Sequence, residues 1–179
     1  MQQLGAEVVT QPGGQAREVA LGIRWWCRCL APHLHGGLSR ADSDGWPDNM
    51  AGVGGAQLDE FDNTYDNADL GLDKVGAHFW YHDHAMNGTR FHVFAGLAGG
   101  YLVPDPRELE LGLPVHAEQG EIHLLLQDRN LTVDDGGELR LLHKTTPDTA
   151  EFFGPVTLVE GLLWPRVPVR PQAYLLRLA

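Results

Sequence analysis

The chain has 179 residues, which is long enough for one domain with a substantial core. Of these residues 43% are hydrophobic and 21% are charged, a composition that can supply such a core. Its 13 basic and 24 acidic residues give a formal net charge of −11, which disfavours binding to the phosphate backbone of nucleic acids. No apolar run reaches the roughly 18 residues of a membrane span, and no export signal is visible at the first residues, so the cellular location stays open.

Short strands separated by turns are the expected elements, because glycine and proline are frequent, at 22 and 11 residues. In chain order, strand patterns occupy residues 19–27, 77–82, 121–127, 131–133, 139–142, 156–159 and 173–178. Residues 36–76 form a long irregular stretch rich in Gly, Asp and Asn, and residues 91–103 suit a turn of helix followed by a strand. The sequence Asp-Gly-Gly at 135–137 predicts a hairpin turn. This pattern, without a long amphipathic helix, predicts an all-β sandwich or Greek-key barrel with long loops.

Two His-x-His pairs, at residues 33–35 and 82–84, are the strongest chemical signal in the chain. On a strand, residues i and i+2 point to one face, so each pair offers two imidazoles side by side. Leu34 between the first two histidines would face an apolar side, and Asp83 between the second two would face polar partners. Two such pairs on neighbouring strands form a four-imidazole cluster, which suits copper, zinc, iron or nickel, and copper(II) binds most tightly in the usual series. The alternative is a set of scattered surface histidines or hydrogen-bonded core histidines.

The sequence around both pairs resembles the multicopper oxidase family, and most of all its branch of spore-coat laccases and bilirubin oxidases. The first motif comprises HLHGG at 33–37 and SDGWP at 43–47. The second motif comprises WYHDHAM at 80–86, TR at 89–90 and AGLAG at 95–99. Shorter matches follow at 127–129 (QDR), 146–148 (TPD) and 152–154 (FFG), so the resemblance extends over residues 30–179.

The resemblance implies a cupredoxin-like (plastocyanin-like) fold and an oxidoreductase that oxidises a reducing substrate and reduces dioxygen to water at a trinuclear copper cluster. By motif position, His33 would bind the type 2 copper, and His35, His82 and His84 would bind the type 3 pair. Asp44, in the SDGWP segment, would lie near the cluster as a proton donor. An acid placed beside reacting oxygen fits general acid catalysis. The resemblance does not indicate which reducing substrate is used.

Only half of the ligand set that the resemblance implies is present in this sequence. The family's two C-terminal motifs, a further His-x-His and a His-Cys-His, do not occur in this sequence, so type 1 copper has no ligands. A monomer is therefore expected to need complementary cupredoxin domains or a complementary chain. We expect residues 1–155 to form the N-terminal cupredoxin-like domain and residues 156–179 to begin the connection to an absent second domain. The apolar strand pattern at 174–179 suggests a truncated chain. The alternative is a catalytically inactive, copper-binding or structural cupredoxin fragment that needs a partner.

Several other features allow more than one interpretation. Cys27 and Cys29 precede the first histidine pair and form either a thiolate–imidazole site or two small buried side chains. The pair at 82–84 lacks the following Asp and His of metallo-β-lactamases, which disfavours a hydrolase. His78 is a candidate outer-shell group, and the remaining histidines are expected to be structural or on the surface. An acidic stretch is expected to be a solvated loop; it contains Asp59, Glu60, Asp62, Asp66, Asp69 and Asp73.

Overall fold

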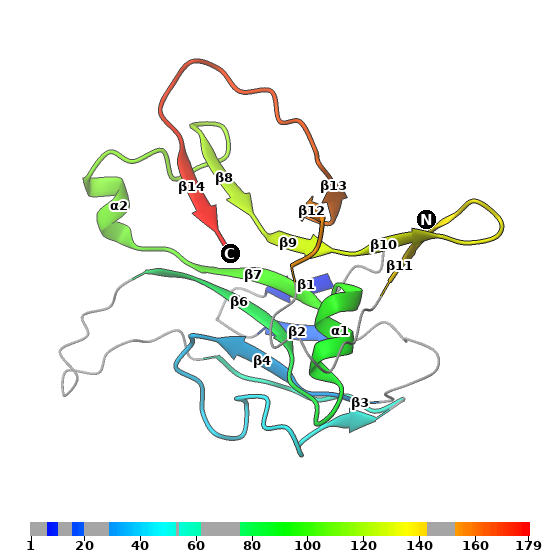
Figure 1. Ribbon diagram of the computed structural model, residues 1–179. Helices are drawn as coiled ribbons and strands as arrows, with labels where there is room; N and C mark the ends of the chain where they lie inside the picture. Colours follow the sequence, from blue (N-terminus) through cyan, green and yellow to red (C-terminus); the bar gives the residue numbers. More distant parts are fainter. Residues whose placement is uncertain (1–6, 11–15, 20–28, 53, 62–75, 143–152) are drawn as a thin grey trace. The chain divides into compact units, whose positions relative to one another are not determined.

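The computed structural model describes residues 7–10, 16–19, 29–52, 54–61, 76–142 and 153–179 (Figure 1). The chain divides into two compact units, Met1–Leu111 and Gly112–Ala179. Strands predominate over helices in the described ranges, as the all-β prediction requires. None of the helices in these ranges has the length and apolar character that crossing a membrane requires. The strand predicted at 19–27 lies outside the described residues apart from Val19.

The first unit is organised around a three-stranded antiparallel sheet with the order β4-β6-β7. Its strands are β4 (Pro32–His35), β6 (Ala77–Asp83) and β7 (Ala98–Val103). The aromatic-rich run predicted at 77–82 is thus confirmed as a strand and continues for one more residue. Two smaller antiparallel pairs accompany this sheet: β1 (Glu7–Thr10) with β2 (Ala16–Val19), and β3 (Cys29–Leu30) with β5 (Ala51–Gly52).

Helix α1 (Thr89–Ala95) connects β6 to β7 and contacts β6. It ends at Gly96, whose φ of 106° lies in the left-handed region that glycine adopts without steric cost. The helical turn and strand predicted within residues 91–103 are therefore confirmed. A second short helix, α2 (Pro106–Glu110), was not expected from the sequence. Its N-cap Asp105 accepts a hydrogen bond from the backbone N–H of Arg107, and proline occupies the first helical turn.

The largest fully buried apolar side chain described in the first unit comes from the histidine-bearing strand β4. Leu34 is 2% exposed and lies between the two histidines of the first pair. The other buried apolar residues described are Ala31, Phe61 and Ala85. Because alternate residues of a strand face opposite sides, burial of Leu34 directs both neighbouring histidines to the other face. The apolar direction predicted for Leu34 is confirmed.

The second unit consists of small, separate sheets (Figure 1). Its strands are β8 (Glu121–Leu124), β9 (Leu126–Arg129), β10 (Leu131–Val133), β11 (Leu139–Leu141), β12 (Val156–Val159), β13 (Leu162–Leu163) and β14 (Leu175–Leu178). The single strand predicted at 121–127 is divided at Leu125. Strand β8 pairs in parallel with β14, whereas β9 pairs antiparallel with β12. The β9–β12 pair joins residues on both sides of position 155, and the predicted domain boundary there stays a prediction.

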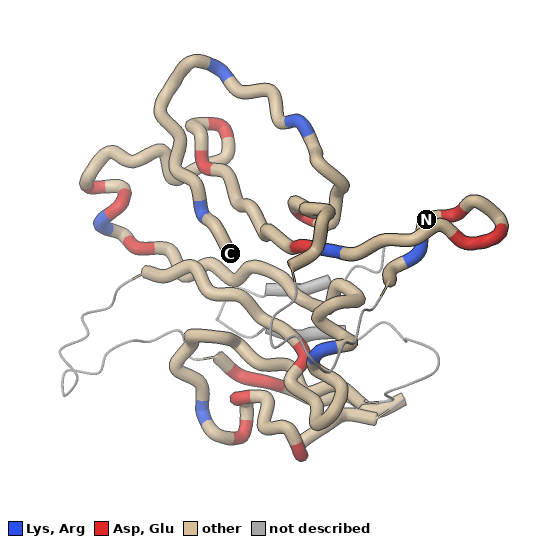
Figure 2. The backbone as a smooth tube through the Cα atoms, viewed as in Figure 1, with Lys and Arg blue, Asp and Glu red and all other residues tan. Residues whose placement is uncertain are grey.

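Local turn chemistry accounts for both hairpins of this unit. Glu160 and Gly161, at φ 51° and 72°, connect β12 to β13, as in the two-residue turns that match strand twist. In the β10–β11 hairpin, one carboxylate oxygen of Asp134 accepts hydrogen bonds from the backbone N–H groups of Gly136 and Glu138. The turn predicted at 135–137 is confirmed, and Figure 2 shows the acidic residues at its tip.

Candidate metal centre

Antiparallel pairing of β4 with β6 brings the two histidine pairs together. His33 lies opposite His82 in the register, and the backbone N–H of His84 donates to the carbonyl of Ala31 at 2.7 Å. The ring centroid of His33 lies 5.6, 5.4 and 5.0 Å from those of His35, His82 and His84. The structure therefore places the rings of the other three histidines close to that of His33.

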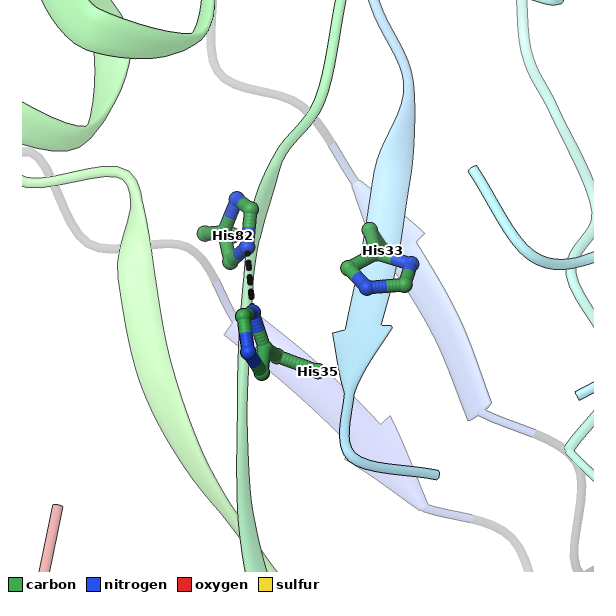
Figure 3. Close-up of side chains that lie close together, drawn as sticks. All are labelled: His33, His35 and His82. Atoms are coloured by element: carbon green, nitrogen blue, oxygen red, sulfur yellow. Dashed lines mark hydrogen bonds between the residues drawn. The ribbon is translucent and has the colours of Figure 1, made fainter. Parts of the chain in front are cut away.

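Three of these side chains are close enough to share a metal ion. His33, His35 and His82 each offer a ring nitrogen, and these three atoms lie within 4.8 Å of one another. Figure 3 shows His33 and His35 on one strand and His82 on the next, with Nδ1 of His35 3.2 Å from Nε2 of His82. Two ligand nitrogens that each lie about 2.0–2.1 Å from one metal ion are themselves about 3–4 Å apart. The spacing therefore suits metal binding.

Main-chain carbonyls fix the tautomers of two of the histidines. Nδ1 of His33 lies 2.6 Å from the carbonyl oxygen of Asp44, and Nδ1 of His82 lies 2.8 Å from that of Asp83. A carbonyl only accepts, so each Nδ1 carries the proton and each Nε2 keeps its lone pair for a metal. Burial lowers the pKa of His82, and the neighbouring imidazoles act in the same direction against the hydrogen bond to Asp83. Its neutral, ligating form is therefore favoured.

A cavity of about 370 Å³ opens beside the first motif, between the two histidine pairs. It is lined by His33, Asp44, Gly45, Trp46, Pro47, Asp48, His84 and Met86. The Asp44 carboxylate is half-buried, and its Oδ1 lies 3.6 Å from Nδ1 of His33. Gly45 has φ 70°, and a Cβ there would collide with the carbonyl oxygen of Pro32. Glycine thus allows the Asp44 loop to approach His33 closely.

The carboxylate of Asp83 is bound by polar partners outside the two histidine pairs, as predicted. It accepts hydrogen bonds from the backbone N–H groups of Ala31 and Ala85 and from Nδ1 of His92. From the sequence, His92 is expected only to be a structural or surface histidine. The side chain is wholly buried in α1, and nothing in its sequence context signals the contact with Asp83.

Other candidate residues have different placements. Cys29 is half-buried in β3 outside the histidine group, and Cys27 lies outside the described residues. The prediction that the acidic stretch is solvated is wrong for Asp59, which is 6% exposed and accepts a hydrogen bond from Gln57 at 2.8 Å. Burial raises the pKa of Asp59. His78 lies in β6 opposite Leu102, and its outer-shell role stays a prediction. The acidic residues within 62–73 lie outside the described residues.

Comparison with known proteins finds relatives over most of the chain. The laccase of Bacillus subtilis is 34% identical over 160 residues, which is 81% of this chain and 29% of that protein. The bilirubin oxidase of Albifimbria verrucaria is 33% identical over 164 residues, which is 90% of this chain and 26% of that protein. The crystal structure of a laccase from Pediococcus acidilactici matches with a TM-score of 0.60 and 26% identity, and covers 77% of this chain and 27% of that one.

The match is confined to part of each relative, since the chain spans less than a third of the length of these three proteins. A comparison with descriptions of known protein families gives no match.

Proposed function

Because this chain belongs to the multicopper oxidase family, a family of oxidoreductases, we propose that it is the N-terminal, copper-binding domain of a laccase-like enzyme. Its all-β fold is cupredoxin-like, as predicted. The proposal assigns it half of the ligands of a trinuclear copper cluster. The observation that carries it is the juxtaposition of His33, His35 and His82, whose ring nitrogens lie within 4.8 Å of one another.

The donor set fits copper. Imidazole nitrogens bind copper well, and copper(II) exceeds the other divalent first-row metals in affinity for such sites. His33 and His82 present unprotonated Nε2 atoms because their Nδ1 protons are held by carbonyls. Nδ1 of His84 is buried and has no hydrogen-bond partner among the described residues, a costly state that a metal would relieve. Copper bound here would pass electrons from the reducing substrate to dioxygen.

Each residue of the site has a distinct proposed role. His33 would bind the type 2 copper, and His35, His82 and His84 would bind the type 3 pair. The main-chain carbonyl of Asp44 orients the His33 ring, while its carboxyl group, on the wall of the adjoining cavity, would hold and deliver a proton. Positioning and proton delivery are thereby divided between two groups of one residue.

The complete activity is proposed for a longer assembly. The relatives are more than three times as long as the matched segment, so oxidation of a reducing substrate coupled to reduction of dioxygen to water would need complementary cupredoxin domains or a complementary chain. Within this chain we propose residues 1–155 as the N-terminal domain and residues 156–179 as the start of the connection to the next. The second candidate, a non-catalytic copper-binding or structural fragment, is favoured by the presence of only two His-x-His pairs.

Copper content per chain tests the metal site directly. After reconstitution and desalting, the wild type is expected to retain copper, and the variant His82→Ala/His84→Ala is expected to lose it. The matched control is His116→Ala/His123→Ala, which removes two exposed histidines of the other unit. Equal copper in wild type and the His82/His84 variant would refute the site.

Addition of the missing region separates the two candidate functions. A complementary laccase segment is added to the wild-type chain and, separately, to the variant His82→Ala/His84→Ala. Dioxygen consumption with the wild type but not with the variant would support the oxidase. Copper retention without dioxygen consumption in a stable complex would support the non-catalytic fragment.

A further inference from the structure

The carboxylate of Asp83 ties together the ends of the two strands that carry the histidine pairs. Its Oδ1 accepts hydrogen bonds from the backbone N–H of Ala31 at 2.9 Å and from that of Ala85 at 3.2 Å. Ala31 lies two residues before His33, and Ala85 directly follows His84. Both hydrogen bonds are buried. One side chain therefore fixes the start of one pair relative to the end of the other.

His92 holds this carboxylate from the opposite side. Nδ1 of His92 lies 2.5 Å from Oδ2 of Asp83, and the two side chains are 1% and 2% exposed. The ring of His92 projects from α1, which contacts β6. A carboxylate only accepts hydrogen bonds, so Nδ1–H of His92 is the donor to Oδ2. All three donors to Asp83 are thus supplied by buried groups.

A polar ring at position 92 is costly in this place. Nε2 of His92 is buried and has no hydrogen-bond partner among the described residues. A buried polar atom without a partner destabilises the fold, so an apolar side chain of similar size would suit general packing better. Among the described residues, the one hydrogen bond of the His92 side chain is to Asp83, the residue between two candidate ligands. That placement points to a role at the histidine cluster.

We propose that His92 is a positioning residue for the metal centre, which acts by holding Asp83 and thereby fixes the spacing between the two histidine pairs. The inference rests on the proposed function, because it takes the four histidines as copper ligands. Without the His92 donor, Oδ2 of Asp83 would be buried and unpaired, and the carboxylate would turn toward water. The bonds to Ala31 and Ala85 would then weaken, and the imidazoles of His33 and His84 would separate.

Copper(II) titration of the full chain tests this proposal, with two substitutions at the same position. His92→Leu removes the donor and is expected to weaken copper binding about 10–100-fold, the range typical of outer-shell partners. His92→Asn retains an N–H donor near the place of Nδ1 and is expected to recover most of the affinity. The electron paramagnetic resonance spectrum of bound copper(II) should change in His92→Leu and resemble wild type in His92→Asn.

A destabilised variant elsewhere in the same unit separates positioning from general stability. Phe61→Leu removes part of a buried ring that lies edge-on to Tyr101, and is expected to lower the melting temperature without changing copper affinity. Equal copper affinity in wild type and folded His92→Leu would overturn the inference, while loss of copper in His82→Ala/His84→Ala would leave the proposed function intact. A wild type that retains no copper would overturn both.

Wild-type protein provides the decisive measurement if His92→Leu does not fold. Coupling between two sites is reciprocal: if the contact between His92 and Asp83 strengthens metal binding, metal binding must also stabilise that contact. Hydrogen exchange of the Nδ1 proton of His92, followed by NMR with zinc(II) as a diamagnetic probe, is expected to slow when the metal binds. An exchange rate that saturating zinc(II) leaves unchanged would overturn the inference.

Discussion

His33 and His82 lie opposite each other on β4 and β6, and each donates a hydrogen bond from Nδ1 to a main-chain carbonyl oxygen. The acceptor of His33 is the carbonyl of Asp44, at 2.6 Å, and the acceptor of His82 is that of Asp83, at 2.8 Å. Both rings therefore keep the lone pair of Nε2, the atom through which each would bind a metal. Because the orienting acceptors belong to the backbone, ring orientation depends on the path of the chain near these residues. Changes that move the backbone should impair the site even where no ligand is altered.

Gly45→Ala is predicted to displace the Asp44 carbonyl from His33. A Cβ at Gly45 would lie 2.8 Å from the Cβ of His33 and would collide with the carbonyl oxygen of Pro32. We expect copper affinity to fall about 10-fold or more, as for loss of an outer-shell partner. Unfolding in denaturant should show a loss of about 1–3 kcal/mol from the forced backbone conformation and a further loss from the collision.

Gly54→Ala is the matched control for this substitution. Gly54 has φ 79°, close to the 70° of Gly45, but a Cβ at position 54 meets no atom within 4 Å. The strain of a left-handed alanine is thus common to both variants, and only Gly45→Ala adds the collision. Equal stability and equal copper affinity in the two variants would contradict the prediction.

Features with local causes could be predicted from the sequence. The strand at 77–83 follows from a continuous aromatic run, and the β10–β11 hairpin follows from the glycines at its turn. The grouping of His33 with His82 also has a local cause, because i and i+2 spacing sets the face of each pair. The pairing of β4 with β6 is the one part of this grouping that the spacing does not determine.

Features with distant causes could not be predicted. The apolar run at 121–127 is one pattern, yet it is divided because Leu125 bonds with Glu160 while Leu126 bonds with Ala179. His92 has an ordinary position in a helix, and only the packing of α1 against β6 gives it a carboxylate partner. Composition suggests a solvated loop around Asp59, yet Asp59 is buried and the backbone N–H of its neighbour Glu60 bonds with the hydroxyl of the distant Ser43.

Asp44→Asn is predicted to separate copper binding from proton delivery. The hydrogen bond to His33 comes from the Asp44 main chain, so copper affinity should stay close to that of wild type. Dioxygen consumption by the complemented enzyme should fall about 10²–10⁴-fold, since an amide does not supply a proton as a carboxylic acid does. Copper analysis and oxygen-electrode measurements on the same samples test both parts.

Asp48→Asn is the control, because Asp48 lines the same cavity and the substitution removes the same charge. We expect its turnover to remain near that of wild type. Equal loss of turnover in the two variants would indicate a general effect of charge in the cavity and would argue against Asp44 as the proton donor.

Asp59→Asn is predicted to stabilise the first unit at neutral pH. Burial raises the pKa of Asp59 above its usual 3.8, and the charge of Asp42 acts in the same direction. A raised pKa means that the folded state holds the proton more tightly, so the ionised group opposes folding at high pH. This penalty disappears as the pH falls through the raised pKa toward 3.8. The melting temperature of the variant should exceed that of wild type at pH 7, and the difference should shrink at acid pH.

The exposed Asp48 again provides a comparison for this substitution, since Asp48→Asn removes one charge without altering a buried carboxylate. Its melting temperature should differ little from that of wild type across the same pH range. A constant difference between Asp59→Asn and wild type from pH 7 to pH 4 would show that ionisation of Asp59 does not affect stability.

Self-association of the isolated chain is the last prediction. Large apolar side chains are exposed in the second unit, including Leu139 at 53% and Leu141 at 46% on one face of β11. Contiguous apolar surface and an exposed strand edge favour contacts between chains. Light scattering at rising concentration should show association of wild type and less association of Leu139→Lys/Leu141→Lys. Glu118→Lys, at an exposed position, changes the net charge by the same two units and should associate as wild type does. A wild type that stays monodisperse at high concentration would refute the prediction.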